Sequence, residues 1–294
     1  PTMFLGYTIK EQSLVAVTRN FDFETNTEIE EEIADYKDFM KKVIKKRMRQ
    51  EVLRLEISNT KSKSITDFLK AEVGITDEMI LVTKSPINMK YVYGLEDIIP
   101  SSVIKKVSYE DFTPFKKYSL ERGSIIKRIE EKDLLLSYPY DDIDTFLDLI
   151  KEAAESDKTI SIKITIYRLA KHSKLVEYLK KACDNGIEVT ALMELKARFD
   201  EENNINYSEE LFKAGCNIMY GFEEYKTHSK LCLITYKDDR ENIKYITQIG
   251  TGNYNENTSK IYTDFSLMTS NEEIGLDAND FFRNMSLAKL NGKY

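Results

Sequence analysis

The sequence contains two histidines, and one of them, His228, has neighbours that suit phosphorus chemistry. His228 lies two residues before Lys230 in the segment KTHSK (226–230), which leads into an apolar run expected to form a strand. Side chains two apart on a strand share a face, so the imidazole and the ammonium can approach one ligand. A neutral imidazole is a good nucleophile near pH 7, and the ammonium would neutralise phosphate charge. We therefore predict His228 as the nucleophile of a phosphate site, with a structural histidine at a strand edge as the alternative.

A glycine-rich turn is a second candidate contact for an anion. Gly250, Gly252 and Asn253 follow a strand-like run at residues 244–249. Glycines let backbone amides approach an anion closely, and the side chain of Asn253 adds an amide donor. An ordinary glycine turn is the alternative, so this segment supports a phosphate site only in combination with His228.

Two arginines are expected at one edge of a sheet. Arg168 directly follows a strand-like run that ends at residue 167, and Arg198 lies four residues after one that ends at Glu194. Two guanidinium groups at such an edge would form a bidentate clamp for phosphate oxygens. The alternatives are helix-entry packing for Arg168 and a local ion pair with the acidic residues at 200–202 for Arg198.

These residues need a scaffold whose strands end side by side, and the second half of the chain has that pattern. Strand-like runs alternate with helical segments of about ten residues, which predicts crossover connections and a largely parallel sheet. Ligands collect outside the carboxyl ends of such strands. Strands are expected at 134–138, 159–167, 188–194, 217–220, 229–236, 244–249 and 261–268, and helices at 143–155, 174–184 and 207–214.

The first part of the chain predicts a smaller unit, followed by a charged segment in which the periodicity fades. Strands are expected at 13–18, 52–58 and 79–83, and helices at 27–49 and 65–73. The predicted fold class is α/β, in two domains and a connector. A small α+β domain is expected at residues 1–100, a connector at 101–132, and an α/β domain with a mixed, largely parallel sheet at 133–294.

The composition excludes several classes of protein. The 294 residues include 43 Lys plus Arg and 50 Asp plus Glu, and the formal net charge of −7 argues against a general nucleic-acid coat. No run approaches the roughly 18 apolar residues of a membrane span. The three cysteines form no CxxC pair, which argues against a disulfide framework or a thiolate zinc site and fits a reducing cytoplasm. Two histidines exclude most His-rich metal sites, and we expect His172 to be solvated.

The order of several short segments closely resembles the ATP-dependent polyphosphate kinase family, which has a phospholipase-D-like catalytic domain and forms a phosphohistidine. The segments are YR (167–168), ELKARFDEENNI (194–205), KTHSKL (226–231), GTGNYN (250–255) and IYTD (261–264). This resemblance covers nearly all of residues 133–286, and the segment from residues 17–20 through residues 51–56 looks like the family's preceding domain. Ser137 departs from the pattern, because many relatives carry a histidine there.

The resemblance implies a transferase that moves the γ-phosphoryl group of ATP reversibly to inorganic polyphosphate. His228 occupies the position of the phosphorylated histidine, and Tyr262 matches a residue assigned to nucleotide contact. Tyr262 and Asp264 are expected on one strand face, with simple packing as the alternative for the tyrosine.

The family also associates two arginines with Mg²⁺, and these match Arg168 and Arg198. Because Mg²⁺ prefers oxygen ligands, we expect the ion to be held by phosphate oxygens that the arginines also contact. ATP or ADP and polyphosphate are the implied substrates, in a cytoplasmic enzyme that forms a homo-oligomer when it is full length. Neither a nucleic-acid partner nor a transmembrane segment is expected, and peripheral membrane association stays open.

Compared with the family, the chain looks like a fragment without the amino-terminal helical domain and the last phospholipase-D-like half. Such a fragment need not turn over by itself. Two other functions stay open at this point. One is a phospholipase-D-like phosphodiesterase, which needs two H-x-K elements and would require a dimer of this chain. The other is a non-catalytic module that binds polyphosphate.

Overall fold

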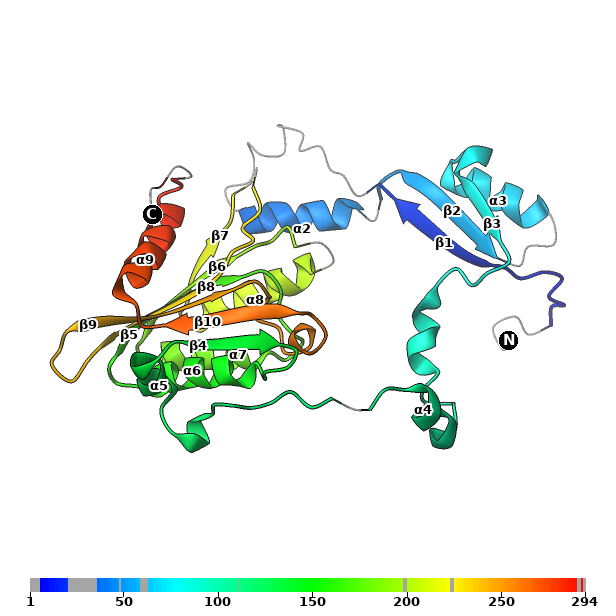
Figure 1. The fold of residues 1–294 in the computed structure, drawn as a ribbon. Helices are drawn as coiled ribbons and strands as arrows, with labels where there is room; N and C mark the ends of the chain where they lie inside the picture. The colour runs from blue at the N-terminus through cyan, green and yellow to red at the C-terminus, as the bar shows by residue number, and fades with distance from the viewer. Residues whose placement is uncertain are drawn as a thin grey trace. The chain divides into compact units, whose positions relative to one another are not determined.

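The chain folds into two compact units, Pro1–Asp111 and Phe112–Tyr294. The structure is a computed structural model that describes residues 6–20, 36–47, 49–58, 63–110, 112–197, 200–222, 225–289 and 292. Figure 1 labels the helices and strands of both units. No helix within these described ranges is long and apolar enough to cross a membrane.

The first unit is built on a three-stranded sheet with the order β1-β2-β3. β1 (Leu14–Arg19) pairs antiparallel with β2 (Val52–Ser58), and β3 (Ile80–Thr83) runs parallel to β2. The parallel pair forms because the helix α3 (Lys63–Val73) provides a crossover connection. The predicted strands of this unit are therefore confirmed to within one residue at each end.

The first unit contains further helical segments besides α3. They are α2 (Tyr36–Arg47), η2 (Asp77–Met79), η3 (Met89–Gly94) and α4 (Ser101–Val107). α2 falls within the helix predicted over 27–49, of which residues 27–35 and 48 lie outside the described residues. α4 lies in the segment interpreted as a connector, so part of that segment is helical.

The second unit contains a seven-stranded sheet with the order β4-β10-β9-β8-β5-β6-β7. The strands are β4 (Leu134–Tyr138), β5 (Thr159–Ile166), β6 (Glu188–Met193), β7 (Asn217–Tyr220), β8 (Lys230–Lys237), β9 (Ile243–Gly250) and β10 (Asp264–Thr269). β8 and β10 run opposite to the other five strands. One edge of the sheet therefore carries the carboxyl ends of those five strands and the amino ends of β8 and β10.

The prediction of a mixed sheet is confirmed, but the sheet is less parallel than predicted. Among the described strands of this seven-stranded sheet, only β5–β6 and β6–β7 are parallel neighbours, and the remaining pairs are antiparallel. The reason lies in the connections. Residues 238–242 turn β8 directly back into β9, and residues 251–263 return the chain to β10, so neither link contains the crossover helix that a parallel pair needs.

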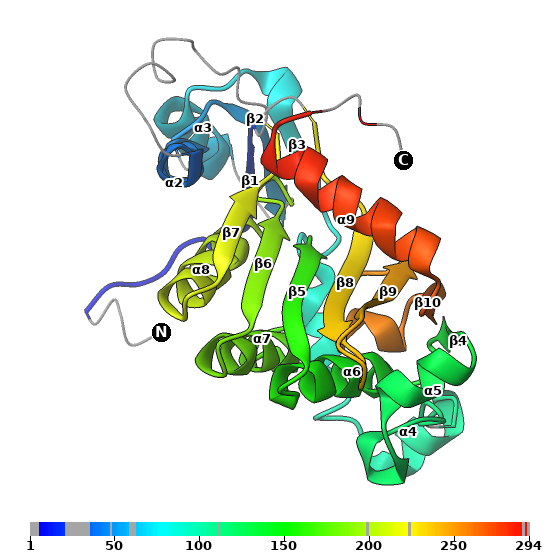
Figure 2. The ribbon, with the colours of Figure 1, turned by 90° about the vertical axis from the view of Figure 1, so that its left-hand side faces the viewer.

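Helices cover both faces of this sheet, as Figure 2 shows. α6 (Asp144–Glu155) and α7 (Lys174–Asp184) bury their apolar residues in the main core with Ile162 and Ile164 of β5. On the other face, α9 (Glu272–Ser286) packs in a separate cluster. The second unit also contains η4 (Leu120–Arg122), α5 (Ile125–Glu131), α8 (Glu201–Lys213) and η5 (Thr258–Lys260).

In the second unit, two element boundaries differ from the prediction by more than one residue, and both affect the candidate site. α8 begins at Glu201 rather than at residue 207, because its polar first turns bury Asn204 instead of forming a loop. β10 begins at Asp264 rather than at residue 261, because η5 continues the turn and the Tyr262 amide donates to the carbonyl oxygen of Thr258 at 2.9 Å. Tyr262 therefore does not share a strand face with Asp264.

Close packing between α9 and the sheet leads to a stability prediction at Gly275. A Cβ atom at Gly275 would lie 2.5 Å from the Cβ of Tyr245 in β9. Although alanine favours a helix over glycine by about 1 kcal/mol, this overlap should outweigh the gain, so Gly275→Ala should lower the free energy of unfolding by about 1–2 kcal/mol. Urea denaturation measures the change. The same substitution in a Tyr245→Gly background, which removes the Cβ atom as well as the ring, should be neutral or stabilising, and a loss that persists there would contradict the packing argument.

Candidate active site

The carboxyl edge of the sheet brings three of the predicted residues around one aromatic ring, that of Tyr167. The imidazole of His228 meets this ring edge-on, with 4.9 Å between ring centroids and 82° between planes. The Nζ of Lys230 lies 5.0 Å from the ring centroid and the Cζ of Arg168 lies 5.7 Å from it. Tyr167 and Arg168 follow β5, whereas His228 and Lys230 lie at the start of β8, so the antiparallel pairing of β5 with β8 creates this cluster.

Lys230 is buried although it is charged. Only 6% of its surface is exposed, and its Nζ donates a hydrogen bond to the carbonyl oxygen of His228. Burial lowers the pKa of Lys230 to about 8, with nearby Arg168 acting in the same direction and Asp264 opposing it. An ammonium with so little solvent is available to stabilise a charged ligand.

His228 is exposed at the mouth of this cluster. Partial burial lowers its pKa below the usual 6.5, and the positive charges of Lys230, Arg168 and Lys226 lower it further. The imidazole is therefore neutral at pH 7, which is the nucleophilic form. His228 also lies in the wall of an open pocket of about 650 Å³, which gives a ligand access to the ring.

A buried carboxylate that the sequence analysis missed holds the segment before His228. Glu194 is 2% exposed and follows β6. Its Oε2 accepts the amide hydrogen of Thr227 at 2.7 Å, and its Oε1 accepts that of Lys196 at the same distance. Burial raises the pKa of Glu194, and the two amide donors lower it. The carboxylate thus ties the segment after β6 to the residue that precedes His228.

Asn204 of α8 links the segment after β6 to the residue that follows β5. It is fully buried, and its Nδ2 donates to the carbonyl oxygens of Tyr167 at 2.8 Å and Glu194 at 2.9 Å. Thr165 adds a further link, because its hydroxyl donates to the carbonyl oxygen of Ser229 at 2.7 Å. Glu194, Asn204 and Thr165 thus hold together the backbone segments at this edge of the sheet. A polar residue whose partners are backbone atoms of other segments leaves no periodic signal in a sequence, which is why these roles were not predicted.

The glycine turn after β9 packs more tightly than an open anion cradle requires. A Cβ at Gly252 would lie 2.6 Å from the Oδ2 of Asp264, and one at Gly250 would lie 2.8 Å from the Nε2 of Gln248. The amide of Thr251 donates to the carbonyl oxygen of Phe265 at 3.0 Å, so it is already engaged. The Oδ1 of Asn253 is buried without a hydrogen-bond partner among the described residues. A Cβ at Gly250 would also lie 3.3 Å from the carbonyl oxygen of Phe265, so close contacts with β10 and with Gln248 explain both glycines, and a phosphate contact at this turn stays a prediction.

The remaining predicted residues have different positions. Arg168 pairs with Asp200, with 2.8 Å between Nε and Oδ2, whereas Arg198 lies outside the described residues. Tyr262 is 60% exposed in the turn before β10. His172 is exposed, as expected.

The described residues do not offer a ready-made cation site. No group of three or more His, Cys, Asp or Glu side chains among them is placed to hold a metal ion. Arg168 and Lys230 are cations and cannot ligate Mg²⁺, which prefers oxygen ligands. The donor set in this part of the chain therefore does not fit a Mg²⁺ ion held by protein side chains.

The fold and the edge cluster thus define an α/β domain with a histidine–lysine pair at the carboxyl edge of its sheet. A family model described as the polyphosphate kinase middle domain matches residues 1–95, and another described as polyphosphate kinase C-terminal domain 1 matches residues 124–291. The chain belongs to the polyphosphate kinase family.

Individual relatives agree with this assignment. Polyphosphate kinases of Lactiplantibacillus plantarum and Staphylococcus epidermidis are each 35% identical over 97% of the chain. A crystal structure of polyphosphate kinase from Porphyromonas gingivalis covers 79% of the chain with 30% identity and a TM-score of 0.63, and 35% of its own length is matched. The chain spans 39% and 38% of the lengths of the two curated relatives.

Proposed function

We propose that this chain carries the phosphate-accepting histidine of a polyphosphate kinase, which transfers the γ-phosphoryl group of ATP to inorganic polyphosphate. The observation that carries the proposal is the placement of a neutral, accessible His228 beside Lys230 and Arg168 around Tyr167. Membership of the family and the named relatives support the choice of substrates.

The proposed reaction has two steps that balance. In the first, a ring nitrogen of His228 attacks the γ-phosphorus of ATP, the bond from that phosphorus to the β–γ bridging oxygen breaks, and ADP leaves. In the second, a terminal oxygen of polyphosphate attacks the phosphohistidine, the P–N bond breaks, and the chain is one phosphate longer. The neutral imidazole is recovered, so donor and acceptor use the same nucleophile in turn.

The surrounding cations have distinct roles in this proposal. Lys230 neutralises charge that develops on the transferring group, because it is buried and lies against the Tyr167 ring that His228 also contacts. Arg168 binds phosphate oxygens with its guanidinium, which Asp200 orients through Nε. We assign Tyr262 to nucleotide contact on the resemblance, Arg198 to phosphate contact on its place in the sequence and the resemblance, and Gly250, Gly252 and Asn253 to phosphate contact on the pattern of the glycine-rich turn.

Mg²⁺ belongs to this proposal only as an ion that arrives on the phosphates of ATP, where it would neutralise phosphate charge. The described side chains do not form a site for it. A cytoplasmic location and a homo-oligomeric full-length enzyme complete the proposal, on the basis of the family.

Labelling with ATP radioactive in the γ-phosphate tests the proposal. We expect the chain to acquire a phosphate that is labile in acid and stable in base, and we expect His228→Ala to abolish it. His172→Ala is the matched control, because it removes the other histidine, which is exposed. It should label like the unmodified chain. Equal labelling of the His228→Ala variant, or hydrolysis of a phosphodiester without labelling by ATP, would refute the kinase assignment.

A further inference from the structure

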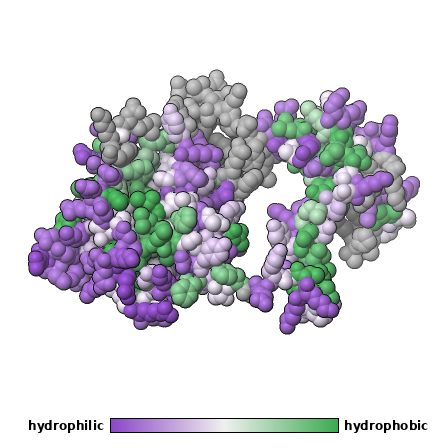
Figure 3. Space-filling view, viewed as in Figure 1, coloured by the Kyte–Doolittle hydropathy of each residue, from purple (hydrophilic) through white to green (hydrophobic). Residues whose placement is uncertain are grey.

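A second group of cations lies outside the candidate active site, in the segment that precedes β4. They surround a pocket of about 320 Å³. We call it the connector pocket and define it by the cations that line it, Lys117, Arg122, Lys127 and Arg128. These residues come from the segment before α5 and from α5 itself, and hydrophilic residues predominate on this part of the second unit (Figure 3).

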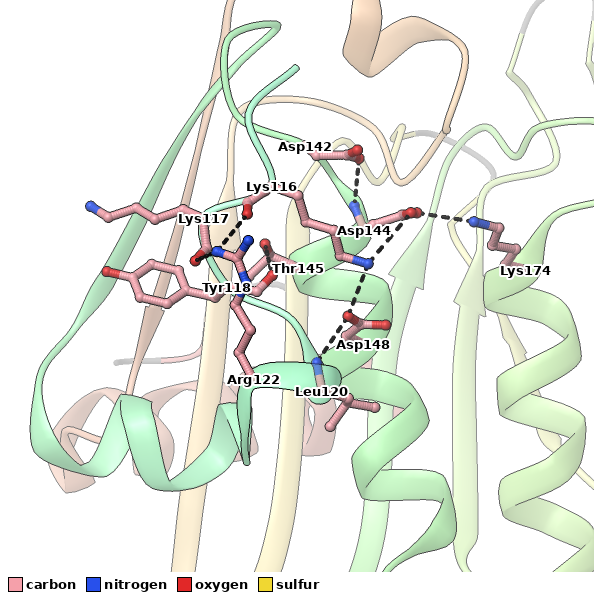
Figure 4. A network of polar contacts seen from close by, with 10 residues as sticks. All are labelled: Lys116, Lys117, Tyr118, Leu120, Arg122, Asp142, Asp144, Thr145, Asp148 and Lys174. Carbon is pink, nitrogen blue, oxygen red and sulfur yellow. Dashed lines mark hydrogen bonds and ion pairs between the residues drawn. The ribbon is translucent and has the colours of Figure 1, made fainter. Parts of the chain in front are cut away.

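The cations of the connector pocket are less neutralised than their neighbour Lys116. Figure 4 shows Lys116 turned toward Asp148 and Asp144, at 3.3 and 3.9 Å, while the side chain of Lys117 projects away from both carboxylates. Among the residues that the structure describes, no carboxylate lies within ion-pair distance of Lys117, and the same holds for Arg122 and Lys127.

One acidic side chain, Glu131, also lines the pocket, and its carboxylate lies 3.8 Å from the guanidinium of Arg128. Four cations against one carboxylate leave the wall of the connector pocket positive. The whole chain has a formal net charge of −7, so this excess is local. Such a wall attracts a ligand that carries several negative charges.

The aromatic ring in this pocket indicates which kind of anion fits. The Nζ of Lys117 lies 5.3 Å from the centroid of the Tyr118 ring, and the Cζ of Arg128 lies 5.9 Å from it. Cations at these distances occupy the space that a stacked nucleobase would need. The pocket therefore favours a ligand made of phosphate groups alone over a nucleotide or a nucleic acid.

Backbone groups near the pocket are already engaged. The amides of Ile125 and Ile126, at the start of α5, donate to the Oε2 of Glu152 at 2.7 and 3.2 Å. These two amides are therefore not available to an anion, and the attraction comes from the ammonium and guanidinium groups of the pocket wall. The Nη1 of Arg122 also donates to the carbonyl oxygens of Lys116 and Lys117 at 3.5 and 3.4 Å, so its other nitrogens must contact the ligand. Guanidinium groups contact two phosphate oxygens at once, and ammonium groups add charge.

We propose that the connector pocket binds an internal stretch of linear polyphosphate, away from the end of the polymer that reacts at His228. The identity of the ligand rests on the proposed function, whereas the anion site itself rests on the charges of the pocket. Linear polyphosphate carries negative charge along its whole length and has no base. A polymer held at a second point has a higher effective concentration at the active site, so this contact would favour long chains.

Binding of end-labelled linear polyphosphate, measured by fluorescence anisotropy at several salt concentrations, tests the proposal. The variant Lys117→Ala/Arg122→Ala/Lys127→Ala should raise the dissociation constant about tenfold or more. The slope of the logarithm of the binding constant against the logarithm of the salt concentration should become smaller in magnitude by about two to three. Lys151→Ala/Lys213→Ala/Lys244→Ala is the matched control with the same change of charge in the same unit. It should bind within about twofold of the unmodified chain.

Equal losses in the two triple variants would overturn the proposal, because the effect would then be one of overall charge. Lys117→Arg/Lys127→Arg should retain binding, which separates loss of charge from misfolding; loss of binding in that variant would also count against the site. Single-stranded RNA with the same number of phosphates should bind more weakly, and equal affinity with the same loss in the triple variant would overturn the choice of ligand.

The failure of this proposal can be distinguished from failure of the proposed function. The loss caused by the pocket variant should persist in a His228→Ala background, where no phosphohistidine can form. A chain that is not labelled by ATP but still shows this loss would contradict the kinase reaction and support the pocket. A chain that is labelled at His228 but binds polyphosphate equally well with and without the pocket cations would support the kinase reaction and contradict the pocket.

Discussion

Replacing Lys230 by methionine is expected to slow the labelling of His228 by ATP about 100- to 1,000-fold, the usual loss for one preorganised donor at a developing charge. Lys230 is almost fully buried, touches the ring that His228 also contacts, and is the cation bonded to the backbone of the nucleophile. Methionine has a similar length and packs well against an aromatic ring, so the fold should persist. Rapid-quench labelling measures the rate constant.

Lys237→Met is the matched control, since Lys237 ends the same strand at the opposite edge of the sheet. It should label within about threefold of the unmodified chain, because a charge so far from the site is screened. A loss of less than about tenfold in Lys230→Met, with an unchanged melting temperature, would show that this ammonium does not stabilise the transferring phosphate.

The pH dependence of the same reaction separates His228 from Lys230. The pKa of His228 is lowered below 6.5, so the imidazole is already neutral at pH 7 and labelling should fall only as acid protonates it. The pKa of Lys230 is lowered to about 8, so its charge, and with it the rate at low ATP concentration, should decline as the pH rises through 8. Lys230→Met should lack this alkaline decline, and Lys230→Arg should move it to higher pH. If the rate still declines above pH 8 to the same extent in both variants, the decline arises from another titrating group.

Replacing Glu194 by alanine should have the second largest effect. The substitution leaves the partly buried amides of Thr227 and Lys196 without their acceptor, at a cost of about 2–4 kcal/mol in the free energy of unfolding. It also frees the residue next to His228, so labelling should slow about tenfold or more, because transfer depends on the position of the nucleophile. Denaturation measures the first effect and rapid-quench labelling the second.

A positioning role for Glu194 can be separated from a role in stability alone. Labelling is compared at a temperature well below the melting point of every variant, where all are folded. Glu194→Gln retains one acceptor oxygen for the two amides, so its rate should be intermediate. Glu188→Ala, at the exposed start of the same strand, is the control and should change neither quantity. Wild-type labelling by folded Glu194→Ala would reduce the role of Glu194 to stability.

Local patterns were enough to predict most elements of the second unit. β4, α7 and β7 begin and end at the predicted residues, because each has a clear period of apolar residues and a short polar boundary. The predicted boundaries are wrong where hydrogen bonds to the backbone, and not a periodic pattern of apolar residues, determine where an element begins. The buried Asn204 makes the polar start of α8 helical, and the turn through Tyr262 delays β10 until Asp264.

The sequence by itself determined the chemistry that this chain can offer: a histidine and a lysine two residues apart at the start of an apolar strand, in an order of segments specific to one family. Tertiary structure alone decided that Arg168 and Lys230 meet His228 on the ring of Tyr167, and that Glu194 holds the backbone before it. The physical reason is that spacing along a chain fixes which side chains share a strand face, whereas the pairing of β5 with β8 and the burial of polar groups depend on contacts between residues far apart in sequence.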